Sequence, residues 1–141
     1  MKRLLGCLSM AALAIVLAAP VSAQTVTVRV SVPFDFLVGG RTMPAGDYIV
    51  ATSGNTGMVL VQNLTRGIVP VMAPSNATDG PRDTGKAFLA FRRYGSDYFL
   101  AKIWDGSADA GRSLPTSTIE REKAKTASIR KPEVVMVLAR R

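Results

Sequence analysis

Histidine is absent from the 141-residue sequence, and the only cysteine is Cys7, close to the N-terminus. The side chains that most often serve as general base, thiol nucleophile or zinc ligand are therefore almost entirely missing. A lone cysteine also leaves no disulfide within the chain, so side-chain packing has to stabilise the fold. We therefore expect no enzyme and no bound metal or other cofactor.

Long apolar runs are also scarce, and the one that stands out lies at the N-terminus. Basic residues precede an apolar run over residues 4–19, and small residues follow at 21–23. This order is typical of a secretory signal peptide, and the run is too short for a permanent membrane span. The sequence predicts a signal peptide over 1–23 and a single exported domain over 24–141, secreted to the periplasm or the outside.

Acidic residues are fewer than basic ones. The chain holds 18 Lys and Arg against 10 Asp and Glu, a net charge of +8. Removal of the signal peptide leaves about +6, which suits an anionic partner. The expected partner is an anionic envelope component, lipid or polysaccharide, or another envelope protein, and export argues against nucleic acid. The alternative is that the charge serves solubility alone.

Strand-forming residues, by contrast, are frequent. Residues 25–32 alternate valine with polar residues, which predicts a strand with one apolar face. The stretch 32–50 predicts a strand, a Gly-Gly corner, a Pro-Gly turn and a return strand. Phe34 and Phe36 are two apart within it and are expected to share a face.

A second hairpin is predicted over residues 86–105. We expect its core-facing side chains to be Leu89 and Phe91 on one strand and Phe99 and Ile103 on the other.

A short helix is predicted over 116–127, where Ser117 and Glu120 have capping-box spacing, and a last strand over 133–139. The whole pattern predicts a mainly all-β fold: an antiparallel β-sandwich or a small open barrel of about seven or eight strands with one short helix.

Basic and aromatic residues gather on the second hairpin and just after it. Such a face can bind phosphate or stack against sugars. The candidate ligand or partner surface comprises Arg92, Arg93, Tyr94, Lys102, Trp104 and Arg112. The alternative is a hairpin whose outer face is charged and whose aromatic rings cover the core.

Other motifs are incomplete. The stretch 105–116 has aspartates at the first and fifth positions of a calcium loop, but Ala110 and Thr116 stand where glycine and glutamate are needed. Ser128 and Lys131 have the S-x-x-K spacing of penicillin-recognising enzymes, but the accompanying S-D-N and K-T-G elements are missing. A polar loop is the preferred interpretation of the first motif, and the second carries no function.

Several motifs together resemble a functionally uncharacterised group of small exported proteins of environmental bacteria. They are Val32-Pro-Phe-Asp-Phe36, Met43-Pro-Ala-Gly-Asp-Tyr48, Arg93-Tyr-Gly-Ser-Asp-Tyr-Phe-Leu100, Ile103-Trp104, and Gly111-Arg-Ser-Leu-Pro-Thr-Ser117 followed by Glu120-Arg-Glu122. The resemblance implies export and a compact β-rich domain, and it supplies no catalytic residue.

The sequence thus predicts an exported, non-enzymatic β-domain of the cell envelope or periplasm with a binding or structural role. An alternative is a small β-barrel that carries an apolar ligand in its interior. A hydrolase that uses two carboxylates is the weakest hypothesis, because no spacing brings two of them together.

Overall fold

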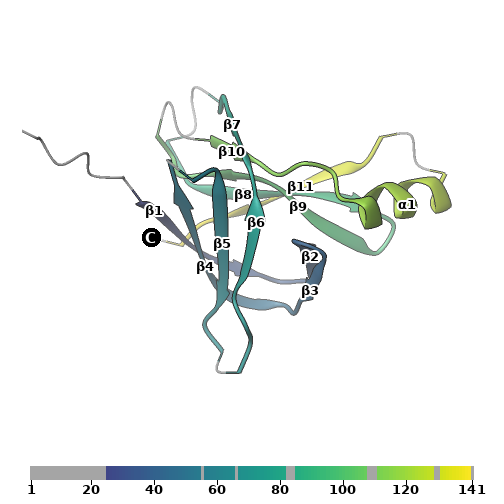
Figure 1. Cartoon of the computed structure of the whole chain (residues 1–141), viewed down its shortest axis with the longest axis horizontal. Coiled ribbons are helices and arrows are strands. Elements are labelled where there is room, and N and C mark those ends of the chain that lie inside the picture. The colour runs from purple at the N-terminus through teal and green to yellow at the C-terminus, as the bar shows by residue number, and fades with distance from the viewer. Residues whose placement is uncertain are drawn as a thin grey trace, which may run out of the picture.

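A computed structural model describes residues 25–54, 56–65, 67–81, 85–107, 111–128 and 131–140. These residues form eleven strands in two sheets and one helix (Figure 1). The expected all-β sandwich with a short helix is confirmed, although the sequence pattern missed several three-residue strands. The predicted signal peptide lies outside the described residues. None of the helical segments in the described part is long and apolar enough to cross a membrane.

The four-stranded sheet is antiparallel, in the order β1-β4-β5-β6. Its strands are β1 (Thr25–Val32), β4 (Gly46–Ser53), β5 (Met58–Asn63) and β6 (Val71–Pro74). The alternating valines of β1 become one wall of the core, since Val28, Val30 and Val32 are buried while their polar neighbours are not. Strand β6 is an edge strand, and Pro70 immediately precedes it. Proline has no backbone N–H to donate to a neighbouring strand, so a position at the sheet edge suits it.

The seven-stranded sheet has the order β11-β8-β9-β10-β7, with the β2–β3 hairpin attached to β9. Its strands are β2 (Phe36–Val38), β3 (Arg41–Met43), β7 (Asn76–Thr78), β8 (Phe88–Tyr94), β9 (Asp97–Trp104), β10 (Gly111–Ser113) and β11 (Glu133–Leu138). The helix α1 (Thr118–Thr126) follows β10 and projects beyond the sandwich (Figure 1).

The two sheets meet at two corners. On one side only Ser75 separates β6 from β7, so nearly continuous chain passes from one sheet to the other. On the other side Ala139, just after β11, bridges Val30 of β1, and the Arg140 N–H donates to the Arg29 carbonyl over 2.9 Å. The sheets do not close into a barrel, and side chains fill the space between them.

Aromatic rings join the first predicted hairpin to the second. The Phe36 ring lies 5.2 Å from Phe91 and 5.1 Å from Tyr48, both edge-on. Phe34 stacks on Tyr98 at 3.8 Å and meets Phe91 edge-on at 5.1 Å. Phe34 and Phe36, which were expected to share a face, both pack against Phe91 of the second hairpin.

Phe99 is buried as expected, 3% exposed, but on the face opposite to the one predicted. The register between β8 and β9 shifts after Ala90, which pairs with Lys102, because Phe91 pairs with Leu100 and leaves Ala101 as an extra residue. Such a bulge reverses which side chains face inward beyond it. Leu100 therefore joins Leu89, Phe91 and Ile103 between the sheets. Phe99 lies on the opposite face, where it is buried beside Tyr94 with 5.8 Å between ring centres.

The predicted Gly-Gly corner is the turn between β2 and β3. Gly39 has φ +57° and Gly40 has φ +77°, a region that side chains other than glycine enter at a cost. Gly39 also approaches the edge of β6, where a Cβ would lie 2.8 Å from Val71 Cγ1 and 3.2 Å from the Met72 carbonyl oxygen. The turn therefore covers part of that edge.

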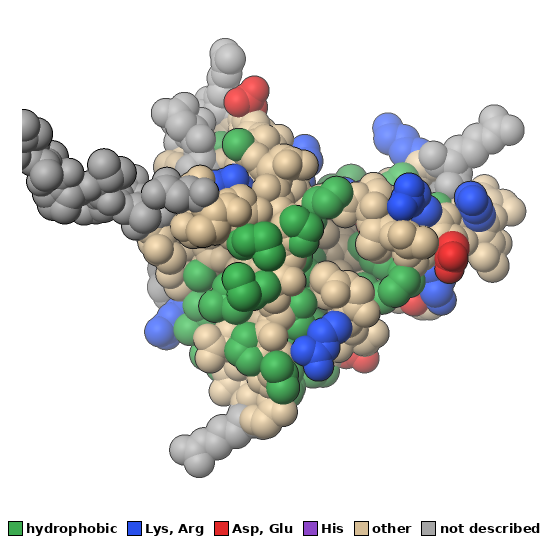
Figure 2. All heavy atoms as spheres, viewed as in Figure 1, with side chains coloured by type: hydrophobic (Ala, Val, Ile, Leu, Met, Phe, Trp, Pro, Cys, Tyr) green, Lys and Arg blue, Asp and Glu red, His purple; other side chains and the backbone are tan. Residues whose placement is uncertain are grey.

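Apolar side chains also reach the surface, over β5 and β6 (Figure 2). Leu64 between these strands, Val69 just before β6 and Met72 within it are each at least half exposed. A second exposed row lies on β11, formed by Val134, Met136 and Leu138.

Candidate functional site

The predicted surface residues do not come together on one exposed face. Tyr94 is buried and Arg92 is mostly buried, both beneath α1. Arg112 turns back onto the sandwich, where its Nη2 donates to the Ser53 and Gly54 carbonyls at 3.1 Å each. It therefore ties β10 to the end of β4.

The remaining members are Arg93, Lys102 and Trp104. Lys102 is exposed on β9. Arg93 is partly exposed, and its guanidinium lies 5.5 Å from the centre of the Tyr98 ring and 3.3 Å from the Glu133 carboxylate. Trp104 is buried, so it is not free to stack against a ligand.

Two glycines account for the burial of Trp104. A Cβ on Gly80 would lie 1.7 Å from the indole ring, and one on Gly111 would lie 2.6 Å from it. These glycines let the chain pass directly over the ring, which packs with Phe88 and Ala90 in a small cluster apart from the main core. Local strand patterns carry no signal for such a contact, because it joins distant segments.

The buried polar group at this end of the molecule is Glu120 on α1. Its Oε1 accepts hydrogen bonds from Arg92 Nε and, at 3.2 Å, from the Tyr94 hydroxyl. Its Oε2 lies 3.0 Å from Arg92 Nη2, so guanidinium and carboxylate meet at two points. Arg92 Nη2 also donates to the Leu114 carbonyl at 3.3 Å. This cluster fastens α1 to the outer face of β8.

The local sequence positions Glu120 for this role. Ser117 is the N-cap of α1, and its hydroxyl oxygen accepts a hydrogen bond from the Glu120 N–H at 3.1 Å. The predicted capping spacing is thus used, and the helix begins two residues later than expected. The glutamate side chain binds the sheet, so one residue both supports the cap and anchors the helix.

Burial and nearby charge also raise the pKa of two tyrosines. Burial raises the pKa of Tyr94 above its ordinary value of 10.0, and the neighbouring Glu120 charge raises it further. Burial likewise raises the pKa of Tyr48, whose hydroxyl donates to the Pro44 carbonyl. Both side chains are thus neutral hydrogen-bond donors at physiological pH, which suits a structural role.

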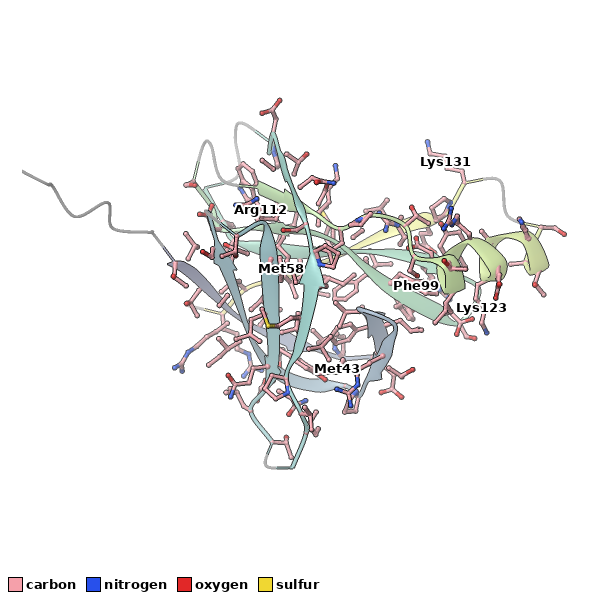
Figure 3. All side chains as sticks on the ribbon, in the orientation of Figure 1. Met43, Met58, Phe99, Arg112, Lys123 and Lys131 are labelled. Atoms are coloured by element: carbon pink, nitrogen blue, oxygen red, sulfur yellow. The ribbon has the colours of Figure 1, made fainter. Side chains whose placement is uncertain are left out.

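Basic side chains gather around α1 (Figure 2). We call Arg121, Lys123, Lys125 and Lys131 the helix surface; all are exposed, and the exposed carboxylate within the helix is Glu122. Lys123 Nζ forms an ion pair with Asp97 at 3.1 Å, and Lys131 lies on the opposite side of α1 in this view (Figure 3). Arg93 joins this region, because it lines the same surface depression as Lys131.

A small hollow lies beside α1, between the end of β6 and the segment that follows β10. Its volume is about 190 Å³. Apolar residues of β2, β6 and β9 form its walls, among them Val38, Ala73 and Phe99. The polar residues that line it are Thr116, Ser117 and Glu120.

Among the described residues, no group of three acidic, histidine or cysteine side chains converges in a way that could hold a metal ion. In the candidate calcium loop, Asp105 Oδ1 instead accepts hydrogen bonds from the Ser107 N–H at 2.8 Å and from its hydroxyl at 2.7 Å. Asp109, its other candidate ligand, lies outside the described residues.

The comparisons with known proteins supply no relative. No protein-family model matches the chain, and no curated protein or solved structure does either. The function has to be argued from the residues and their geometry alone.

Proposed function

We propose that the protein is an exported, non-enzymatic β-sandwich of the cell envelope that binds an anionic envelope component through the helix surface. The observation that carries this proposal is the charge of α1 and of the segment after it, where Arg121, Lys123, Lys125 and Lys131 are exposed. The nearby carboxylates are Glu122, which is exposed, and Asp97, which pairs with Lys123. Clustered lysine and arginine side chains attract anionic lipid headgroups and acidic polysaccharides.

The fold supports this assignment in two ways. The helix projects beyond the sandwich, so a flat anionic surface can reach it (Figure 1). The Arg92–Glu120 ion pair holds it against β8, so the three cations on α1 are presented on a rigid support. Rigid presentation reduces the entropy that is lost when the surface binds.

Vesicle binding tests the proposal. The protein is mixed with vesicles of phosphatidylglycerol and phosphatidylcholine, with vesicles of phosphatidylcholine alone, and with lipopolysaccharide or an acidic polysaccharide. We expect binding to the anionic partners at low salt, weakened at high salt by screening, and none to the neutral vesicles. Absence of binding to every anionic partner at low salt would refute the proposal.

Paired charge variants locate the contact. Lys125→Gln with Lys131→Gln removes two charges from the helix surface, and Lys86→Gln with Lys102→Gln removes two exposed charges elsewhere. A lysine near an anionic membrane is worth about 1 kcal/mol, so the first pair should weaken binding about thirtyfold. The control pair should change it less than about threefold, because screening limits the effect of distant charges. Equal losses from both pairs would exclude the helix surface as the specific contact.

The carrier hypothesis is the weaker proposal. A carrier of a large apolar ligand needs an interior cavity, and here the largest core side chains, including Phe36, Tyr48 and Phe91, are fully buried between the sheets. The hollow beside α1 is smaller than the 300–1,000 Å³ that is typical of sites for drug-sized ligands.

A further inference from the structure

The hollow beside α1 is built from segments that the fold brings together from far apart in the sequence. Leu37 and Val38 come from β2, Ala73 from the end of β6, and Phe99 and Leu100 from β9. Strands hold all three walls in place, so the hollow is a feature of the folded domain and not of a loop.

Two residues at the rim, Gly40 and Thr116, leave the hollow open to solvent. Gly40 lies there, and a Cβ added to it would meet no atom within 4 Å. Thr116 lies on the opposite segment and is exposed. The hollow is therefore reached from solvent between the β2–β3 turn and the residues that precede α1.

Its size limits what it can hold. The volume is about 190 Å³, close to that of an apolar cavity of about 150 Å³ that binds benzene. One aromatic ring or one branched alkyl group fills such a space. Apolar walls favour that group because its burial removes apolar surface from water.

The polar end of the hollow also restricts which ligands it can bind. A carboxylate has about four acceptor positions, and the bonds from Arg92 and Tyr94 use three of those on Glu120. About one position remains on Oε2, and Glu120 is one of the residues that line the hollow. None of the residues that line the hollow is a lysine or arginine, so an anionic ligand finds no cation there.

We propose that this hollow is a binding site for a small organic molecule that has one aromatic ring or branched alkyl group and a hydrogen-bond donor, an amine or hydroxyl, at one end. The apolar group occupies the walls formed by Val38, Ala73 and Leu100, and the donor bonds Glu120. This site is separate from the helix surface and does not depend on it.

Three probes of equal ring size test the chemistry: benzylamine, benzyl alcohol and phenylacetate. Each is titrated into the protein, and backbone amide shifts are followed by NMR. We expect benzylamine and benzyl alcohol to bind with a Kd of about 1 mM, a usual affinity for fragments of this size. Phenylacetate should bind at least about tenfold more weakly, because its carboxylate meets the Glu120 carboxylate. Largest shifts should fall on Leu100, Thr116 and Ser117.

A blocking variant tests the location. Thr116→Trp places an indole at the rim and should reduce benzylamine affinity at least about tenfold, while Thr27→Trp, an exposed control on β1, should leave it unchanged. Unfolding curves show whether each variant is folded, and shifts in the parent protein test the site without any variant. Failure of the benzyl probes to bind, equal binding of phenylacetate, or unchanged affinity in Thr116→Trp would overturn the proposal.

Discussion

Arg92 and Glu120 meet at two points across the gap between β8 and α1, with Nη2 3.0 Å from Oε2 and Nε bonded to Oε1. Glu120 is only 1% exposed, although it belongs to an otherwise solvated helix. The apolar side chains of α1 are few, and its Ile119 is exposed. The buried ion pair, together with the Tyr94 hydrogen bond and the more exposed Lys123–Asp97 pair, therefore fixes the helix to the sheet.

Removal of one partner of this pair should be destabilising. Glu120→Ala leaves the Arg92 guanidinium and the Tyr94 hydroxyl without their acceptor, and we expect the free energy of unfolding to fall by about 3 kcal/mol. Glu122→Ala, exposed on the same helix, is the control and should change it by less than about 0.5 kcal/mol. Urea unfolding followed by Trp104 fluorescence gives both values. Equal effects would show that the buried pair does not hold the helix.

Gly80→Ala should disturb the packing of Trp104. The new Cβ would lie 1.7 Å from the indole ring, so the loop or the ring has to move. Overpacking of this kind costs about 1–3 kcal/mol. Gly54→Ala is a matched control, because its Cβ meets nothing within 4 Å. A red-shifted Trp104 emission and a lower midpoint are expected for the first variant only, and an unchanged spectrum would contradict the close approach.

Alanine variants of the β2–β3 turn can separate the cost of backbone strain from the cost of steric overlap. Gly40→Ala adds a Cβ in open space at φ +77°, so it should cost only the left-handed strain, about 1 kcal/mol. Gly39→Ala adds a comparable strain and an overlap with Val71, and should cost about 1–2 kcal/mol more. Thermal unfolding of the two variants measures the difference. A smaller loss for Gly39→Ala than for Gly40→Ala would refute the contact with β6.

Stability should fall at alkaline pH. The raised pKa of Tyr94 means that the folded protein keeps this hydroxyl neutral at pH values where the unfolded chain ionises it. Its contribution is therefore fully present below pH 10.0, the ordinary value, and is lost as the pH rises through the folded pKa. Urea midpoints measured from neutral pH to above pH 10 give the dependence. Tyr94→Phe should flatten this decline, and an identical decline in that variant would assign the effect to other groups.

Export has a direct chemical signature. If residues 1–23 are a cleaved signal peptide, the mature protein begins at Gln24 and lacks Cys7. Expression of the whole chain in a bacterial host, followed by osmotic-shock fractionation, should yield a protein that contains no titratable thiol. Mass spectrometry of its N-terminal peptide fixes the start. A full-length protein retained in the cytoplasm would contradict the prediction.

Short-range patterns were sufficient to predict much of the fold. The period of two over 25–32 placed the buried valines correctly, and the spacing of Ser117 and Glu120 located the helix start within two residues. The Gly39-Gly40 corner is also where the sequence placed it. These features depend on residues close together in the chain, whose preferences survive in the folded domain.

Features set by distant contacts could not be predicted. The bulge at Ala101 is a property of the pairing between β8 and β9, and it moved Phe99 to the opposite face. Trp104 was assigned to the candidate surface, but it is buried because the chain at Gly80 and Gly111 passes directly over its ring. Arg92 is mostly buried because it pairs with Glu120. The sequence signal for this pairing was a helix with too few apolar residues to pack against the sheet through them alone.

The bridge between Val30 and Ala139 has a consequence for how the chain reaches this shape. Strand β1 already pairs with β4 along its length, and through this bridge it meets a second neighbour that comes from the other end of the described chain, so this corner forms only through a long-range contact. Closure of this corner is therefore a non-local step, and contacts of that kind form more slowly than those between residues close together in the chain.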